Sequence, residues 1–352
     1  MTRRRVAFAA AAAAIAFLGG FAALLAIDVY LHSKYERSAG VNVWGYRGPV
    51  VGRKQPGEYR IAMLGGSSAF GYGVTWDRAI PARLERDLER QLPGGRTFRV
   101  VNLGYNNEGA YSFTFTMKDY EYLRYDLVCL YEGYNDLMAD ERRPNVQVFR
   151  HDSPIFRLTG YLPIFPIIFK EKAASMLAGG DPGALYRAES KTVFRPGLAA
   201  RAAASVLSAT GDAGQAVERQ LDRVSAEAPH RVGDVAGTGC RPPWGQYCRA
   251  VADAIDLARA GGRDVLFITQ PYERIDEASH TRHVDQQREA LAMVRRRFAA
   301  DPHVGAVDLG EAVDLRDPAL SFDGMHLTAE GNARIAARLV EPVMAMAARG
   351  GV

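Results

Sequence analysis

Hydrophobic residues along the chain follow two alternating patterns. Short continuous apolar runs, bounded by glycine, proline or polar residues, occupy residues 59–66, 98–106, 126–136, 263–271 and 303–313. Between these runs lie stretches of helical length, in which apolar positions recur about every four residues, as at Ile80, Leu84 and Leu88. Strands that alternate with amphipathic helices predict an α/β fold, in which helices cover both faces of a central parallel sheet.

The N-terminal segment has a different pattern. Residues 6–27 form a stretch of 22 residues without a charged side chain. As a helix this stretch measures ~33 Å, enough to cross the ~30 Å hydrocarbon core of a bilayer. Arg3, Arg4 and Arg5 precede it, and a basic cluster of this kind stays on the cytoplasmic side. We therefore predict a single-pass anchor at 6–27 in the inner membrane, with residues 1–5 in the cytoplasm and the rest facing the periplasm.

Two other interpretations of residues 6–27 are open. A cleaved signal peptide also begins with basic residues, but its apolar part is usually only ~7–15 residues long, and no clear cleavage site follows here. A buried alanine-rich helix of the folded domain would have the same composition. The length of the stretch favours the uncleaved anchor.

The charge balance argues against a nucleic-acid partner. The net charge is +4, and the three N-terminal arginines leave only +4 − 3 = +1 for the rest of the chain. No basic face is evident in the remaining sequence. The composition, 48% hydrophobic and 24% charged, is that of a folded protein with one sizeable domain and an insertion.

The three cysteines differ in their surroundings. Cys129 lies within an apolar run and is expected to be buried. Cys240 and Cys248 flank the segment RPPWGQY, whose prolines and glycine suit a short closed loop. An oxidising compartment permits a disulfide between them, although two free thiols fit the sequence equally well. No histidine lies at ligand spacing from this pair, so a metal site there is not expected.

The strand and helix pattern is interrupted in the middle of the chain. Residues 28–58 are expected to be a linker and lead-in, and residues 59–138 and 241–348 to form the main domain. Residues 139–240 are expected to be an inserted subdomain or lid. This insertion contains an apolar segment broken by prolines, such as Pro154, which exclude a regular membrane helix. The segment is either the core of the subdomain or a surface that touches a bilayer or an acyl chain.

Residues with acyl-transfer chemistry follow the predicted strands. Ser67 follows the first strand, Gly104 the second and Asn135 the third, while Asp323 and His326 precede the last helix. Because loops after parallel strands gather at one edge of a sheet, we expect these side chains to meet there. A histidine can activate a serine hydroxyl, an aspartate can orient the histidine, and amide groups can bind an oxyanion.

These blocks resemble the SGNH/GDSL hydrolase superfamily in both order and content. The matching segments are Gly65-Gly66-Ser67-Ser68, Gly104, Gly133-Tyr134-Asn135-Asp136 and Asp323-Gly324-Met325-His326. Gly66 departs from the family pattern, which usually has aspartate at this position. The resemblance covers about residues 59–138 and 245–345 and implies a flavodoxin-like three-layer α/β/α fold.

The resemblance also implies roles for individual residues. Ser67 would be the nucleophile, His326 the base and Asp323 the group that orients it. The Ser67 amide, the Gly104 amide and the Asn135 side chain would form the oxyanion hole. No metal or organic cofactor is implied.

Four further polar positions have structural interpretations. Ser68 is expected to be a turn or helix N-cap hydroxyl, and Asp136 a structural loop carboxylate. His280 and His283 are expected to be solvated positions on a helix.

Three functions fit these residues. The leading hypothesis is a serine esterase that hydrolyses an acyl ester, such as an O-acetyl group, of a cell-envelope glycan or lipid through an acyl-serine intermediate. An envelope O-acyltransferase would use the same triad with a sugar hydroxyl as acceptor. A non-catalytic envelope binding protein would keep the fold without the activity. The oligomeric state is open.

Overall fold

The computed structural model describes residues 3–38, 40–91, 96–138, 143–177, 198–224 and 238–349. The described residues form two compact units, each made from two separate stretches of the chain. The first unit lies within 1–34 and 153–227, and the second within 35–152 and 228–352. Residues 139–142, 178–197 and 225–237 of the expected insertion lie outside the described residues.

The second unit is built on a five-stranded sheet in the order β2-β1-β3-β4-β5. All neighbouring strands are parallel. The strands are β1 (Glu58–Gly65), β2 (Thr97–Asn102), β3 (Leu127–Tyr131), β4 (Asp264–Ile268) and β5 (Val304–Val307). This order is that of flavodoxin-like sheets, and it confirms the predicted α/β fold.

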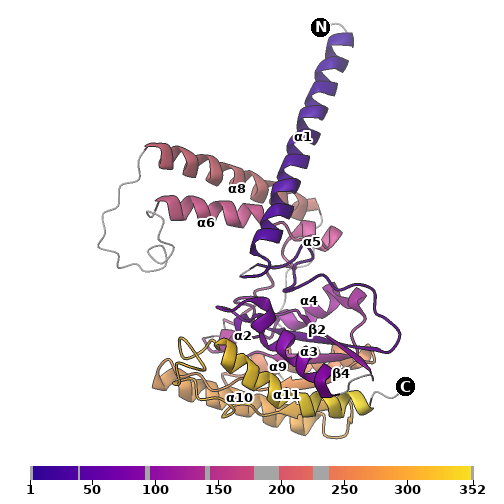
Figure 1. Cartoon of the computed structure of the whole chain (residues 1–352), viewed down its shortest axis with the longest axis vertical. Helices are drawn as coiled ribbons and strands as arrows, with labels where there is room; N and C mark the ends of the chain where they lie inside the picture. Colours follow the sequence, from indigo (N-terminus) through magenta and orange to yellow (C-terminus); the bar gives the residue numbers. More distant parts are fainter. Residues whose placement is uncertain are drawn as a thin grey trace. The chain divides into compact units, whose positions relative to one another are not determined.

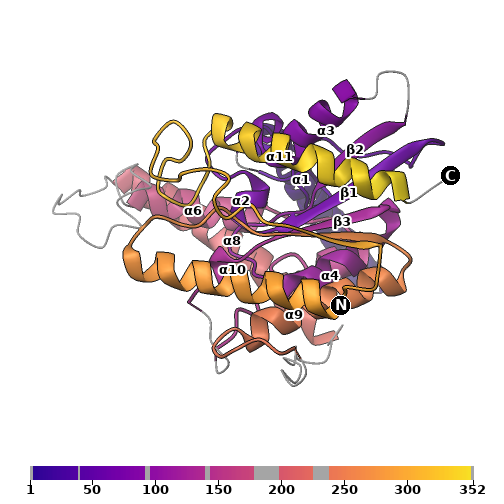
Figure 2. The same cartoon turned by 90° about the horizontal axis from the view of Figure 1, so that it is seen from below.

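Helices cover both faces of this sheet, as Figure 2 shows. One face carries α3 (Ile80–Gln91) and α11 (Ala329–Arg349), which also pack on each other. The other face carries α4 (Ser112–Asp119), α9 (Gly245–Ala260) and α10 (Glu277–Arg297). The apolar stripe of α3 forms part of the core, because Ile80, Leu84 and Leu88 are each 0% exposed. Every residue of β3 and β4 is buried, as expected for inner strands covered on both faces.

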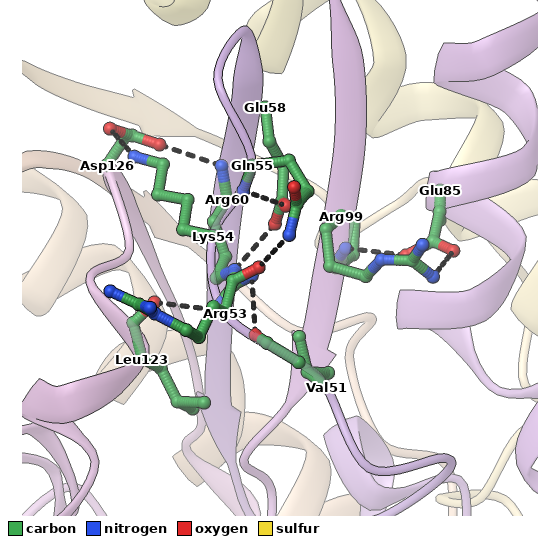
Figure 3. Close-up of polar contacts among 12 residues, drawn as sticks. Val51, Arg53, Lys54, Gln55, Glu58, Arg60, Glu85, Arg99, Leu123 and Asp126 are labelled. Carbon is green, nitrogen blue, oxygen red and sulfur yellow. Dashed lines mark hydrogen bonds and ion pairs between the residues drawn. The ribbon is translucent and has the colours of Figure 1, made fainter.

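Hydrogen bonds and ion pairs between polar side chains hold the amino ends of the central strands (Figure 3). The Arg60 guanidinium is buried and donates to the Leu123 carbonyl at 2.8 Å and to a Glu58 carboxylate oxygen at 2.6 Å. Asp126 accepts from the Arg60 backbone N–H at 2.7 Å and pairs with Lys54 at 2.5 Å. These contacts satisfy buried groups at the edge of the sheet opposite to the strands' carboxyl ends.

The first unit begins with a long apolar helix, α1 (Arg3–Tyr35). Among the described residues it is the one helix long and apolar enough to cross a membrane, with a best window of mean hydropathy 2.3 and no buried residue in that window. A signal sequence would have the same properties. The helix continues beyond Ile27 to Tyr35, so the first part of the expected linker is helical.

The end of α1 is tied to the helices that follow Ser153. The unit contains α5 (Pro154–Thr159), α6 (Phe165–Leu177) and α8 (Leu198–Val224), and α6 and α8 run side by side (Figure 1). Asp28 is buried and accepts from the N–H groups of Ile164 and Phe165 at 2.8 and 2.6 Å. A carboxylate at this position satisfies free N–H groups at the start of α6 and complements the helix dipole.

Cys240 and Cys248 form a disulfide within the second unit, with the Cα atoms 6.5 Å apart. The sequence left this bond open. Cys129 is a free thiol in β3 and is fully buried, as predicted. Burial raises the pKa of Cys129 to about 12, so this thiol stays protonated and unreactive.

Candidate active site

The candidate site lies where the sheet order reverses. β1 pairs with β2 on one side and with β3 on the other, so the loops after β1 and β3 leave the sheet side by side. A short helix, α2 (Ser67–Phe70), begins directly after β1, and a 3₁₀ turn, Tyr134–Asp136, follows β3. Ligand groups in open parallel sheets gather at this kind of crevice.

The structure brings Ser67, His326 and Asp323 into one hydrogen-bonded chain. The Ser67 Oγ atom lies 2.8 Å from His326 Nε2, and His326 Nδ1 lies 2.6 Å from Asp323 Oδ2. Because an ionised carboxylate only accepts, the proton of the neutral ring lies on Nδ1. Nε2 therefore presents its lone pair to the Ser67 hydroxyl, as a general base must.

The loop before α11 holds this histidine by its backbone as well as by its ring. Asp323 Oδ1 accepts from the N–H groups of Met325 and His326 at 3.0 and 2.6 Å. The Ser321 hydroxyl donates to the His326 carbonyl at 2.9 Å. Partial burial opposes ionisation of Asp323, but the hydrogen bonds with His326 outweigh it and lower the pKa of Asp323.

Two of the three expected oxyanion donors are available at the serine. Ser67 is the first residue of α2, after Gly66 at the N-cap, so its N–H has no acceptor within the helix. The Asn135 side chain is half-buried and donates one hydrogen to the Glu108 carbonyl at 2.9 Å. Its amide carries two hydrogens, which leaves the second for a ligand.

Gly104 differs from the other two donors. Its N–H already donates to the Asn102 side-chain oxygen at 3.1 Å. A side chain at this position would lie 2.6 Å from the Phe70 nitrogen, so glycine allows α2 to pack closely against the end of β2. The close approach of α2 accounts for this glycine without a direct role in oxyanion binding.

Two sequence interpretations were wrong. Ser68 is not an N-cap, because Gly66 caps α2, and the Ser68 hydroxyl is buried without a partner among the described residues. His283 is not solvated: it is 0% exposed, and its Nδ1 accepts from the Glu273 N–H at 3.0 Å. Burial lowers the pKa of His283 to about 3, so the ring stays neutral. Periodicity alone did not reveal this burial, because α10 contacts α9 and β5 through long-range packing.

Two buried acidic groups beside the site, Glu132 and Glu108, were not singled out from the sequence. Glu132 directly follows β3 and is 1% exposed. Asp136, which the sequence analysis gave as a structural loop carboxylate, is 5% exposed. Glu108 is also buried and pairs with Arg150 at 3.3 Å. The sequence signal for Glu132 was its position between an apolar strand and Gly133, where an acidic side chain lies next to buried residues.

Two aromatic side chains flank the histidine on the solvent side. Tyr72 and Phe322 are 50% and 47% exposed. The Tyr72 ring centre is 4.8 Å from that of His326, and the Phe322 ring lies nearly parallel to His326 at 5.9 Å. Both positions therefore offer an open, flat apolar surface beside the reactive groups.

No group of three or more His, Cys, Asp or Glu side chains is placed to hold a metal ion in the described parts of the chain. The chemistry that this arrangement supports is activation of the Ser67 hydroxyl by His326.

Comparisons with known proteins give structural matches only. No family model matches the chain. No curated protein matches it either. The lipase/acylhydrolase from Enterococcus faecalis has a TM-score of 0.41 at 15% identity, over 81% of this chain and 95% of that one.

Two further solved structures have similar values. A member of the lipolytic protein G-D-S-L family from Veillonella parvula has a TM-score of 0.40 at 10% identity, over 80% of this chain and 97% of that one. An acetylxylan esterase variant from Geobacillus stearothermophilus has a TM-score of 0.42 at 11% identity, over 83% and 95%. The solved structures similar to this chain thus include lipolytic proteins of the G-D-S-L family and acetylxylan esterases.

Proposed function

We propose that the protein is a serine ester hydrolase of the SGNH/GDSL type. His326 takes the proton from Ser67 as Oγ attacks the ester carbonyl carbon, and the resulting oxyanion is bound by the Ser67 amide and the Asn135 side chain. The intermediate then collapses to an acyl-serine, and His326 gives its proton to the departing alcohol. Water, deprotonated by His326, attacks the acyl-serine and releases the acid and the free Ser67 hydroxyl.

The observation that carries this proposal is the Ser67–His326–Asp323 chain. Its three residues come from two loops 256 to 259 positions apart, and their contacts of 2.8 and 2.6 Å are those of a base and its orienting group. Ser67 is only 8% exposed, so its environment is partly shielded from water, which strengthens the electrostatic effect of the oxyanion donors.

We propose that the enzyme acts at the periplasmic side of the inner membrane. The apolar helix α1 and the three arginines at its start support an anchored chain with this orientation. The Cys240–Cys248 disulfide is consistent with an oxidising compartment.

For the substrate, we propose an acyl ester on a sugar ring of an envelope glycan. Tyr72 and Phe322 present half-exposed rings beside His326, which is the side from which the alcohol group departs. Open aromatic faces suit the flat apolar face of a pyranose ring better than a flexible acyl chain, which needs an enclosed pocket. This observation favours the glycan over the lipid substrate.

Labelling with a fluorophosphonate tests the proposed activity. We expect one adduct on the intact wild-type chain, none on Ser67→Ala and an unchanged adduct on Ser68→Ala, which is the matched control. Release of free acid from an acetylated oligosaccharide would then establish hydrolysis, whereas transfer of the acetyl group to an added sugar would establish an acyltransferase. A folded wild type without an adduct would contradict the proposal and favour a binding protein.

A further inference from the structure

A single buried carboxyl group connects the two loops that carry the proposed nucleophile and the Asn135 donor. Glu132 Oε2 accepts from the Gly66 N–H at 2.5 Å, one residue before Ser67. Glu132 Oε1 accepts from the N–H of Asn135 at 2.9 Å. The side chain of Glu132 is almost fully buried, so water does not compete for these bonds.

The glycine at position 66 matches this arrangement. A Cβ atom at Gly66 would lie 2.4 Å from Glu132 Oε2 and 2.1 Å from Asn135 Nδ2. Real Cβ atoms do not approach other atoms so closely, so any side chain here would displace the carboxyl group or the amide. Glycine at position 66 therefore leaves room for the Glu132 carboxyl group, which reaches this turn from the loop after β3.

We propose that Glu132 is a positioning residue of the proposed esterase, which sets the distance between the Ser67 turn and the Asn135 side chain. The two oxygens of one carboxyl group are a fixed distance apart, and each binds a backbone N–H of one loop. Because the oxyanion must be reached by the Ser67 amide and the Asn135 amide together, a shift between the loops weakens binding of the transition state more than binding of the substrate. This proposal rests on the proposed function.

The surroundings of Glu132 are consistent with a rigid element. Its carbonyl accepts from the Tyr247 hydroxyl at 2.6 Å, which links the same residue to α9. The neighbouring Asp136 accepts from the Ala110 N–H at 2.8 Å and so holds the loop after β2. Burial and the nearby Asp136 raise the pKa of Glu132 to about 8.

The test compares Glu132→Gln with Glu85→Gln in the full chain. The glutamine keeps the shape of Glu132 but presents an NH₂ group to one of the two N–H donors. Glu85 is the control. Its carboxylate also accepts a backbone N–H, that of Val100 at 2.7 Å, and it pairs with Arg99 at 2.8 Å (Figure 3). Arg99 and Val100 pair with Arg60 and Ile61 of β1, six to seven residues before Ser67. Acetate release from acetylated xylo-oligosaccharide gives kcat and KM for each variant.

We expect Glu132→Gln to lower kcat about 10- to 100-fold with KM changed less than about twofold, and Glu85→Gln to retain wild-type values. An unchanged kcat, or a loss shared by Glu85→Gln, would overturn the proposal. If Glu132→Gln does not fold, Gly66→Ala disturbs the same contact from the other partner, and an unchanged kcat in that variant would also overturn it. A folded wild type that takes no fluorophosphonate adduct would refute the proposed function itself, which is a different result.

Discussion

Four residues at the carboxyl edge of the sheet differ in how far they are buried. Ser67 and Glu132 are buried, His326 is 16% exposed at its side chain, and Asp323 is 41% exposed. The exposed Asp323 is nevertheless fixed. Its carboxylate accepts from the backbone N–H groups of Met325 and His326 and from the Nδ1–H of the His326 ring. The geometry needed for proton transfer thus has two sources. Local hydrogen bonds hold the Asp323 side chain, and burial holds Ser67.

The aromatic pair beside His326 gives a prediction about the substrate. We expect Tyr72→Ala and Phe322→Ala each to raise KM for an acetylated oligosaccharide about fivefold to tenfold, because ~1–1.4 kcal/mol of ring stacking is lost. Tyr122→Ala is the control, since Tyr122 is 58% exposed on a distant turn. If KM for a small alkyl acetate rises by the same factor as KM for the oligosaccharide, the rings do not recognise the sugar.

The buried acids give a prediction about pH. Burial raises the pKa of Asp136 to about 7 and, together with Asp136, that of Glu132 to about 8, from ordinary values near 4. The native state therefore keeps protons that the unfolded chain releases. Stability from these groups is fully present below about pH 4 and is lost as the pH rises to about 8, by up to ~1.4 kcal/mol per pH unit for each proton.

We expect Asp136→Asn to make the free energy of unfolding less dependent on pH between 5 and 8. The asparagine oxygen still accepts from the Ala110 N–H but does not titrate. Urea unfolding of wild type and variant at several pH values measures the difference. Parallel pH curves for the two proteins would contradict the assigned burial of this carboxyl group.

At the scale of elements, long-range contacts hold the short loops that make up the site. The 3₁₀ turn that carries Asn135 is held by two side chains. The Tyr134 N–H donates to the side chain of Gln270, just after β4, at 3.0 Å. The Gln287 side chain on α10 donates to the Glu132 carbonyl. The turn has only three residues and too few internal bonds to keep one shape alone. Its position therefore depends on the packing of α10 on the sheet.

The disulfide that ties the start of α9 to the preceding loop gives a prediction at this scale. Cys240 and Cys248 are 8 positions apart, and closing such a loop restricts the unfolded chain by ~2–3 kcal/mol. We expect Cys240→Ser/Cys248→Ser to lower Tm by about 4–10 °C. Dithiothreitol should lower the Tm of the wild type by a similar amount and leave the variant unchanged. Equal Tm values for oxidised and reduced wild type would show that the bond contributes no stability.

At the scale of the whole chain, the N-terminal helix is either an uncleaved membrane anchor or a cleaved signal peptide. Residues 6–27 are apolar throughout, whereas Asp28 and His32, one turn further on, are buried polar residues of the first unit. The change from apolar to bonded polar residues within one continuous helix fits a segment that leaves the bilayer at Asp28.

We expect the full chain to stay with membranes after carbonate extraction and to retain its N-terminal residues by mass spectrometry. Ala14→Arg with Leu18→Arg should weaken insertion, because each charge at the centre of the helix costs ~2.5–3.5 kcal/mol. A deletion of residues 1–27, which keeps Asp28, should release the protein to the soluble fraction. A membrane-free chain that begins after Ile27 in cells would establish a cleaved signal instead.

The sequence by itself determined the alternation of strands and helices and the apolar N-terminal helix. It also determined that Ser67 and Asn135 follow strands and that Asp323 and His326 precede the last helix. These features depend on local periodicity and on the rule that loops after parallel strands share one edge. Only the tertiary structure decided that the Gly104 N–H donates to the Asn102 side-chain oxygen, that His283 is buried and that α1 continues past Ile27 to Tyr35. It also decided that Glu132 joins two loops 66 residues apart, because such contacts depend on which strands become neighbours, and no local pattern encodes that choice.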